Sequence, residues 1–206
     1  NLNFHYIMKN LFIALFAMSI PALAVATNGD DKTSYKVDTD KSSVDWKGYK
    51  VTGQHAGTIA IADGIVMMDG DKLTGGEFTL DMTSIAVTDL TGEMQGKLEG
   101  HLKSDDFFGV QTFPKAMLKI TKVKAKSDGY HVTADLTIKG ITEPIEFTAN
   151  VMEKDGVMHA MSDIKIDRSK YNVRYGSNSF FDNLGDKAIY DEFDLTVNLV
   201  LGEPAS

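Results

Sequence analysis

The chain has 206 residues, no cysteine, and 21 basic against 29 acidic residues, which gives a net charge of −8. The missing cysteines exclude disulfides and thiolate metal sites in this chain. The negative charge argues against nucleic acid or anionic lipid headgroups as the main electrostatic partner, because both would repel an acidic protein.

The first 26 residues have the three-part pattern of a bacterial secretion signal. The short positive segment Met8-Lys9-Asn10 is followed by an apolar run that ends at Pro21 and by small residues suited to cleavage after Ala26. The run is too short to span a bilayer. We therefore expect residues 1–26 to be a cleaved signal peptide with Met8 as its start, although an N-terminal buried helix is the alternative.

Cleavage would leave about 180 residues, enough for one domain with a substantial core. The removed segment contains Lys9 and no acid, so 20 basic against 29 acidic residues leave a net charge of −9. We expect a flexible leader over 27–34, a single domain over 35–206 and no stable transmembrane segment in the mature chain. An exported, acidic, cysteine-free chain suits the bacterial periplasm.

Alternation of apolar and polar residues, the signature of a strand, recurs through the mature region. In chain order it covers 44–50, 57–62, 65–68, 77–83, 116–123, 130–139, 145–151, 157–167 and 193–201. Turn signals stand at Asp63-Gly64, Asp69-Gly70, Gly75-Gly76, Asp128-Gly129, Gly140 and Asp155-Gly156. About eight strands joined mostly by hairpins predict an all-β fold, either an antiparallel barrel or a sandwich.

One segment departs from this alternation. Residues 91–104 place Met94, Leu98 and Leu102 at helical spacing, and two glycines weaken the pattern. We expect one short helix there, followed by a turn at Ser104.

Alternation alone does not decide whether the apolar faces point into a barrel or out into lipid. The strands carry no aromatic pairs flanking an apolar band, and the sequence ends Leu-Gly-Glu-Pro-Ala-Ser without a terminal aromatic residue. Both features favour apolar side chains that point inward. A barrel of about eight strands has an interior that side chains can fill or that can hold one slim ligand.

Catalytic and metal-binding patterns are weak in this sequence. The histidines (His5, His55, His101, His131 and His159) show no HxH or HExxH spacing, and there is no GxSxG motif. The segment Leu73-Thr74-Gly75-Gly76 is expected to be a hairpin tip, because no helix follows it to hold a phosphate. We expect no enzyme, no metal and no cofactor, although a hydrolase or isomerase using His55 or His101 with Asp105 stays open.

Two aromatic clusters are candidates for a ligand site. Phe107, Phe108 and Phe113 follow Ser104-Asp105-Asp106, and the segment from Asp167 to Phe181 carries Tyr171, Tyr175, Phe180 and Phe181 beside Arg168 and Arg174. Tyrosine and arginine near a strand end suit the mouth of a cavity from which the polar end of an apolar ligand emerges. A lid that only completes the core and a salt-bridged surface loop are the plain alternatives.

Motifs along almost the whole mature chain resemble the YceI-like family, the polyisoprenoid-binding proteins of the bacterial periplasm. The most specific is the run from His101 to Phe108 followed by Phe113-Pro114, and the run from Leu136 to Pro144 is nearly as specific. The remaining motifs are Tyr35 to Asp38 with Ser43 to Trp46, Val51 to Gly57, and Phe78 to Ile85. The segment from Arg168 to Gly176 departs mildly from the family's arginine-to-glycine spacing.

The resemblance implies a lipocalin-like, extended antiparallel β-barrel that binds an isoprenoid chain, such as a ubiquinone or polyprenyl tail, without catalysis. The helix and the aromatic loop after it would cover the barrel and wall the tunnel. The candidate ligand-binding positions are Phe78, Leu80, Leu98, Leu102, Phe107, Phe108, Phe113, Leu136, Ile138, Phe147, Tyr171, Tyr175, Phe193 and Leu195. The candidate head-group or mouth positions are His55, His101, Arg168 and Arg174.

A rival interpretation keeps the barrel and removes the ligand. A fully packed barrel would act through its surface, as an envelope stress or adhesion protein. A homodimer through an exposed strand edge is possible in either case.

Overall fold

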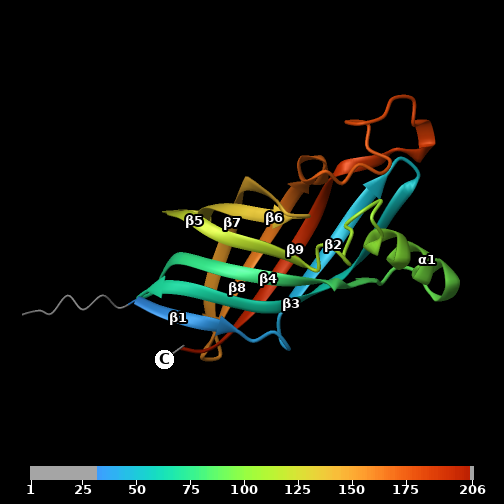
Figure 1. Ribbon diagram of the computed structural model, residues 1–206. Helices are drawn as coiled ribbons and strands as arrows, with labels where there is room; N and C mark the ends of the chain where they lie inside the picture. The colour runs from blue at the N-terminus through green and yellow to red at the C-terminus, as the bar shows by residue number, and fades with distance from the viewer. Residues whose placement is uncertain (1–31, 205–206) are drawn as a thin grey trace, which may run out of the picture.

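The computed structural model describes residues 32–204, so the expected secretion signal lies outside the described residues. The described chain forms nine strands, one α-helix and two short 3-10 helices, and Figure 1 shows how the strands and α1 are arranged. In chain order they are β1 (Lys32–Val37), β2 (Ser43–Lys50), β3 (Gly53–Asp69), β4 (Lys72–Val87), α1 (Gly92–Lys103), β5 (Lys115–Lys126), β6 (Gly129–Ile138), β7 (Ile141–Lys154), β8 (Val157–Asp167), η1 (Arg168–Tyr171), η2 (Gly185–Lys187) and β9 (Ile189–Pro204).

Eight of these strands close into an antiparallel barrel, which confirms the predicted fold class. The order β3-β2-β9-β8-β7-β6-β5-β4 is completed by the pairing of β4 with β3. β1 pairs with the same two neighbours as β2, at 65–69 of β3 and near Leu201 of β9. β1 and β2 thus lie in line between β3 and β9, and residues 38–42 connect them. β1 begins at Lys32, before the expected domain start at residue 35.

Tight turns join the strands where the sequence carries positive-φ signals. Asp155 and Gly156 have φ of 53° and 77°, and Lys139 and Gly140 have φ of 52° and 73°, as the two-residue hairpins that twist with their strands require. The turn after Asp69 and the turn before Gly129 also lie where the sequence predicts them.

Two predicted turns are wrong. Asp63-Gly64 lies inside β3 and Gly75-Gly76 lies inside β4, so Leu73-Thr74-Gly75-Gly76 is not a hairpin tip. A Cβ on Gly64 would stand 2.8 Å from a methyl carbon of Val37, so the glycine marks close packing rather than a turn. Register shifts in the β3–β4 pairing, one of them between Ile61 and Asp63, let these long strands bend around the barrel.

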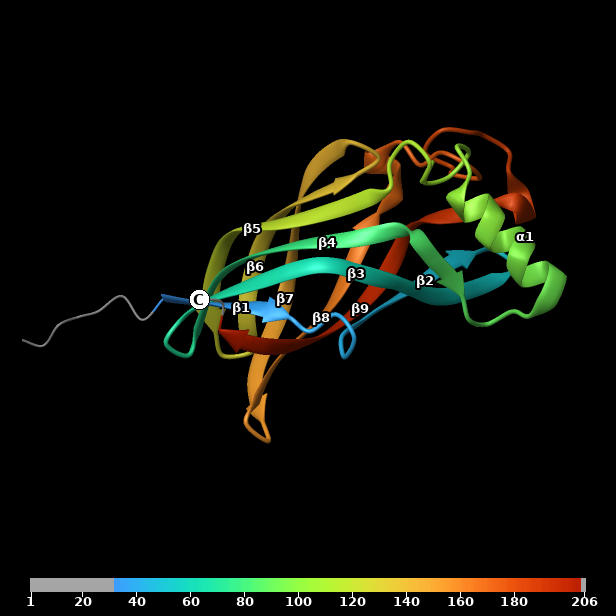
Figure 2. The same ribbon diagram turned by 60° about the horizontal axis from the view of Figure 1, so that its bottom comes forward.

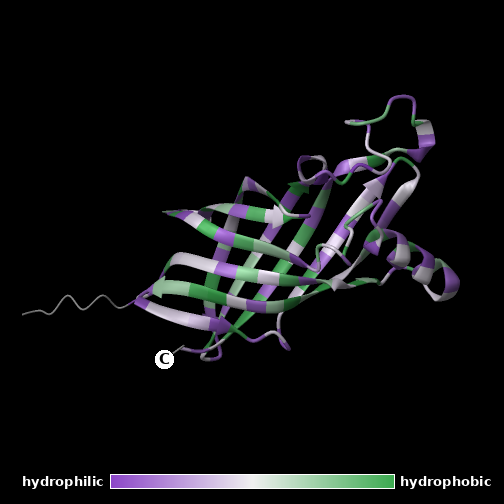
Figure 3. Ribbon diagram, in the orientation of Figure 1, coloured by the Kyte–Doolittle hydropathy of each residue, from purple (hydrophilic) through white to green (hydrophobic). Residues whose placement is uncertain are grey.

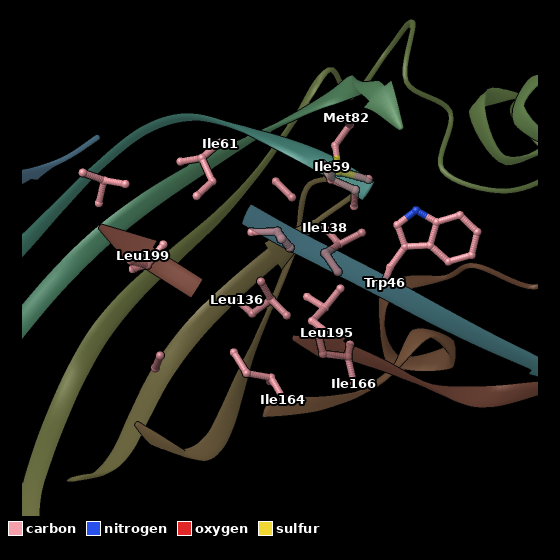
Figure 4. Close-up of a cluster of buried hydrophobic side chains, with 14 of the residues drawn as sticks. Trp46, Ile59, Ile61, Met82, Leu136, Ile138, Ile164, Ile166, Leu195 and Leu199 are labelled. Carbon is pink, nitrogen blue, oxygen red and sulfur yellow. The ribbon is translucent and has the colours of Figure 1, made fainter. Parts of the chain in front are cut away.

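Every strand contributes buried side chains from its inward face to the core. Figure 3 shows the alternation of apolar and polar residues along the strands. On β6 the even-numbered residues Val132, Ala134, Leu136 and Ile138 are all buried. Figure 4 shows side chains from several strands that converge inside the barrel. The apolar faces therefore point inward.

Helix α1 lies at one end of the barrel, as Figures 1 and 2 show. Polar side chains fix it to the end of β4, because Glu99 accepts a hydrogen bond from the Val87 amide (2.9 Å) and Gln95 donates one to the Val87 carbonyl (3.0 Å). Leu102 is the buried anchor of the helix. No helix within 32–204 has the length and apolar character needed to cross a membrane.

Candidate functional site

Two of the cavities formed by the described residues share no lining residue, and the barrel strands contribute walls to both. The first, called the body cavity below, takes its walls from all eight barrel strands, β2 to β9. The space in it that is open to the centre of a water molecule is about 110 Å³.

The accessible surface of the body cavity is entirely apolar. Its one lining residue with a polar side chain is Ser162, and that hydroxyl donates a 2.8 Å hydrogen bond to the carbonyl of Thr148 in the wall. A molecule in this cavity would therefore find no partner for a polar group, and burying a bare polar group costs several kcal/mol. The cavity suits a hydrocarbon chain.

The second cavity, called the helix-end cavity, lies between α1, the loop after it and the strand ends of the barrel. Its space open to the centre of a water molecule is about 120 Å³. Apolar walls come from Leu98 and Leu102 of α1, from Phe107 and Phe108, and from Trp46 of β2. Polar side chains also reach it, namely Tyr49, Lys50, His55, His101, Arg168 and Tyr190. This end can accept both an apolar group and a polar group.

A single layer of side chains lies between the two cavities. Inward-facing neighbours on one strand line different cavities: Trp46 and Val44 on β2, Ile59 and Ile61 on β3, and Phe193 and Leu195 on β9. Trp46 and Leu195 are also direct partners across the β2–β9 pairing. Met82 and Ile138 line neither cavity and lie buried in the same core cluster (Figure 4).

The structure brings most of the predicted ligand residues to these cavities. Those at the body cavity are Phe78, Leu80, Leu136, Phe147 and Leu195. Those at the helix-end cavity are Leu98, Leu102, Phe107, Phe108 and Phe193, together with the predicted mouth residues His55, His101 and Arg168. No feature of the sequence separates the residues of the body cavity from those of the helix-end cavity.

The other predicted site residues line neither cavity. Ile138 and Tyr171 are buried in the core, and Phe113 packs against Gly140. Tyr175 is 47% exposed, although its ring meets the His101 ring edge-on at 4.3 Å. Arg174 is exposed and lies over the Phe180 ring, 5.0 Å from its centroid. The first three positions belong to the packing around the cavities, and the last two lie at the surface.

Sequence reasoning missed several wall residues. They are inward positions of predicted strands, and they include Val44, Trp46, Ile59, Ile145, Ala149, Ala160, Ile164, Val197 and Leu199. The period-two pattern already placed each on the apolar face of its strand, which is the signal that could have found them.

Arg168 is the buried charged group at the base of the helix-end cavity, and only 2% of it is exposed. Its guanidinium donates to the carbonyls of Tyr190 (3.1 Å), Val173 (2.8 Å) and Ile189 (3.0 Å). Asp191 forms an ion pair with it at 3.5 Å. Burial lowers the pKa of Arg168, and the charges of Asp191 and Asp167 oppose that effect. Most of its donors are used on the protein itself, so Arg168 mainly holds the cavity base together.

The two histidines at this end contact different groups. The Nδ1 atom of His55 lies 3.0 Å from Asp89, and the His101 ring packs edge-on against Phe107, with 5.7 Å between centroids. Burial raises the pKa of Asp89, but hydrogen bonds from the Ala56 amide and from His55 outweigh it, so the net shift is downward. Within the described chain, no cluster of three or more histidine, aspartate or glutamate side chains could hold a metal ion.

Tyr171 carries a buried hydroxyl with no hydrogen-bond partner among the described residues. Burial, followed by the charges of Glu143 and Asp167, raises the pKa of Tyr171 to about 12. Tyr171→Phe removes an unpaired buried polar group, so we expect unfolding at neutral pH to need the same denaturant concentration or slightly more.

The raised pKa also predicts a pH effect at this position. The folded pKa lies above that of the unfolded chain, so the contribution of Tyr171 to stability is complete below pH 10 and is lost as pH rises through about 12. Denaturant unfolding at pH 7, 10 and 11.5 should therefore show a smaller alkaline loss for Tyr171→Phe than for the unmodified protein. A lower stability of Tyr171→Phe at pH 7 would show that the hydroxyl has a partner.

Comparison with known proteins gives a family match over most of the chain. Residues 35–201 match the family described as YceI-like domain. A curated relative from Shewanella denitrificans, named UPF0312 protein, is 28% identical over 151 residues, which cover 70% of this chain and 73% of that protein. Other curated relatives match over shorter parts, between 27% and 60% of their own length.

Two solved structures share the fold. BcnA from Burkholderia cenocepacia superposes with a TM-score of 0.65 at 25% identity, covering 80% of this chain and 98% of that chain. A domain from Saccharophagus degradans superposes with a TM-score of 0.59 at 15% identity, covering 84% and 99%. That domain is described as a polyisoprenoid binding domain implicated in plant cell wall breakdown.

Proposed function

This chain belongs to the YceI-like domain family, and from that premise we propose that it binds a polyisoprenoid lipid, such as a quinone or a polyprenyl chain, inside the barrel. The observation that carries the proposal is the body cavity, whose accessible surface is wholly apolar. The shared fold with a domain described as polyisoprenoid-binding supports it.

The tail would supply most of the affinity. Each buried methylene contributes about 0.8 kcal/mol, so one five-carbon isoprene unit gives roughly 4 kcal/mol before ordering costs. A head-group hydrogen bond adds a net of about 1 kcal/mol. Affinity should therefore depend strongly on chain length and weakly on the head group.

We place the tail in the body cavity and the polar end toward the helix-end cavity, where Tyr49, His55, His101 and Tyr190 supply polar atoms. A long tail must also displace the layer between the cavities, and Met82 and Ile138 are flexible or aliphatic side chains that can shift rotamer. The protein would act as a periplasmic carrier or sequestering protein with no catalytic machinery of its own.

Trp46 offers a direct optical test, because it is the single tryptophan of the chain and it lines the helix-end cavity. We expect ubiquinones to quench its fluorescence on binding, since the quinone ring would lie near the indole. A ubiquinone with eight isoprene units should bind at least tenfold more tightly than one with two, and replacing its ring by a menaquinone ring should change affinity only a fewfold. Equal affinity for both tail lengths would contradict tail-driven binding.

A further inference from the structure

The barrel wall has a slit between β4 and β5. Backbone pairing between these strands joins Glu77–Asp81 to Lys115–Lys119 and goes no further within the described chain. β4 nevertheless begins at Lys72, and β5 continues to Lys126. Figure 1 shows the two strands running apart beyond their paired part. We call the unpaired stretch, 72–76 of β4 and 120–126 of β5, the side slit.

The side slit borders the body cavity. Leu73 from one edge and Ile120 from the other both line that cavity. At the far end of the slit, the Tyr130 hydroxyl donates a 3.2 Å hydrogen bond to the carbonyl of Asp71 and so joins the two hairpin tips. The side slit is thus a stretch without backbone pairing that is bounded at both ends, with apolar side chains of the body cavity behind it.

The β5 edge of the slit is basic although the chain as a whole is acidic and the β4 edge, residues 69–77, carries three acids against one lysine. Residues 115–138 contain five lysines (Lys115, Lys119, Lys122, Lys124 and Lys126) against Asp128 and Asp135, a net charge of +3 in a chain of −8. Lys119 pairs with Glu77 at 2.6 Å, and Asp128 pairs with His131 at 3.1 Å. Within the described residues, Lys122, Lys124 and Lys126 form no ion pair, and Glu146 is the acid that shares a surface hollow with all three.

Two methionines add exposed apolar surface near the slit. Met117 on β5 is 49% exposed and Met67 on β3 is 38% exposed. The Met67 sulfur lies across Gly75, at 3.3 Å from where a Cβ would stand, so the glycine leaves it room beside the slit edge. Exposed flexible apolar side chains next to lysines suit the boundary between lipid headgroups and acyl chains.

We propose that the outer face of β5 docks on an anionic phospholipid bilayer and that the lipid tail passes through the side slit between the bilayer and the body cavity. This proposal rests on the proposed function. Lysines near an anionic surface are attracted to it, and the attraction falls off within a Debye length, so a local row of lysines can bind where the net charge would not. An apolar opening facing the bilayer lets a tail move without crossing water.

The test is flotation of the protein with vesicles of phosphatidylcholine alone or mixed with phosphatidylglycerol, both free of isoprenoids. We expect binding to the anionic vesicles and not to the neutral ones. K122E/K124E/K126E should lower partitioning to anionic vesicles by about a hundredfold. The matched control K97E/K154E/K187E makes the same change in net charge at exposed positions away from the slit, and it should bind nearly as the unmodified protein does.

An equal loss of binding in both triple variants would overturn the proposal, because net charge alone would then explain the binding. Absence of binding to anionic vesicles would also overturn it. Circular dichroism and thermal unfolding confirm that the variants are folded.

A second measurement follows Trp46 quenching by ubiquinone carried in the anionic vesicles. The slit-side variant should load more slowly from vesicles and equally well from ethanol-dispersed ubiquinone. Failure of all variants to bind dispersed ubiquinone would refute the proposed function, while vesicle flotation would still decide the docking surface.

Discussion

Replacing Arg168 by alanine is expected to lower the free energy of unfolding by about 3–5 kcal/mol, as for other buried pairs that lose one partner. The change would leave the carbonyls of Tyr190, Val173 and Ile189 without their donor. It would also leave the Asp191 carboxylate without its cation. Each buried group left unpaired is costly, so the losses should add up to a large effect. Urea unfolding followed by circular dichroism measures it.

Arg174→Ala is the matched control, because Arg174 is an exposed arginine in the same segment that stacks on Phe180. We expect a change within about 0.5 kcal/mol, as for most surface positions. Similar losses in the two variants would mean that Arg168 does not hold the cavity base. Arg168→Ala should also weaken ubiquinone binding in proportion to the fraction of protein that unfolds.

Filling the body cavity from inside should abolish lipid binding. Ala160 lines this cavity from β8, and Ala160→Phe would place a ring where the tail is proposed to lie. Excluding about one isoprene unit removes roughly 4 kcal/mol, which corresponds to about a thousandfold weaker binding of an eight-unit ubiquinone. Trp46 quenching reports the loss. We expect the added ring to lower the free energy of unfolding by about 1–3 kcal/mol, which is the cost of overpacking.

Asn198→Phe is the control for the added ring. Asn198 is exposed on the outer face of β9, one position along from Leu199, the direct partner of Ala160. It should leave ubiquinone affinity unchanged. If Ala160→Phe stays folded and binds as tightly as the control, the tail does not occupy the body cavity.

Local patterns in the sequence predicted most of the fold. Period-two alternation placed the strands and their inward faces, and helical spacing of Met94, Leu98 and Leu102 placed α1. The turns at Asp63-Gly64 and Gly75-Gly76 were wrong because a glycine can mark a turn or a tight contact, and only the neighbouring strand decides between them. β1 and β2 occupy the same place in the barrel wall because both pair with β9, which is distant in the sequence. No local sequence pattern reveals that pairing.

The candidate site was predicted less completely. Alternation identifies an inward residue but not its height in the barrel, so it could not separate Leu195 at the body cavity from Phe193 at the helix-end cavity. It also could not separate Ile138, which is packed in the core, from Leu136, which lines a cavity. Arg168 and Arg174 stand in the same segment, and no local pattern tells them apart. The structure buries Arg168 in η1 and leaves Arg174 exposed.

Net charge does not describe how charge is distributed over the surface. The sum over the chain argued against an anionic lipid surface, yet the lysines of β5 gather on the outer face of one strand. Strand period brings Lys122, Lys124 and Lys126 to the same side of the sheet. The fold therefore creates a basic patch that the total hides.

The central claim is tested most directly by extracting bound lipid from the protein after purification without detergent from the cells that produce it. Organic solvent followed by mass spectrometry should release an isoprenoid lipid at close to one molecule per protein, and much less from Ala160→Phe. Protein that carries no isoprenoid and takes none up from dispersed ubiquinone would contradict the account and favour a barrel that acts only through its surface.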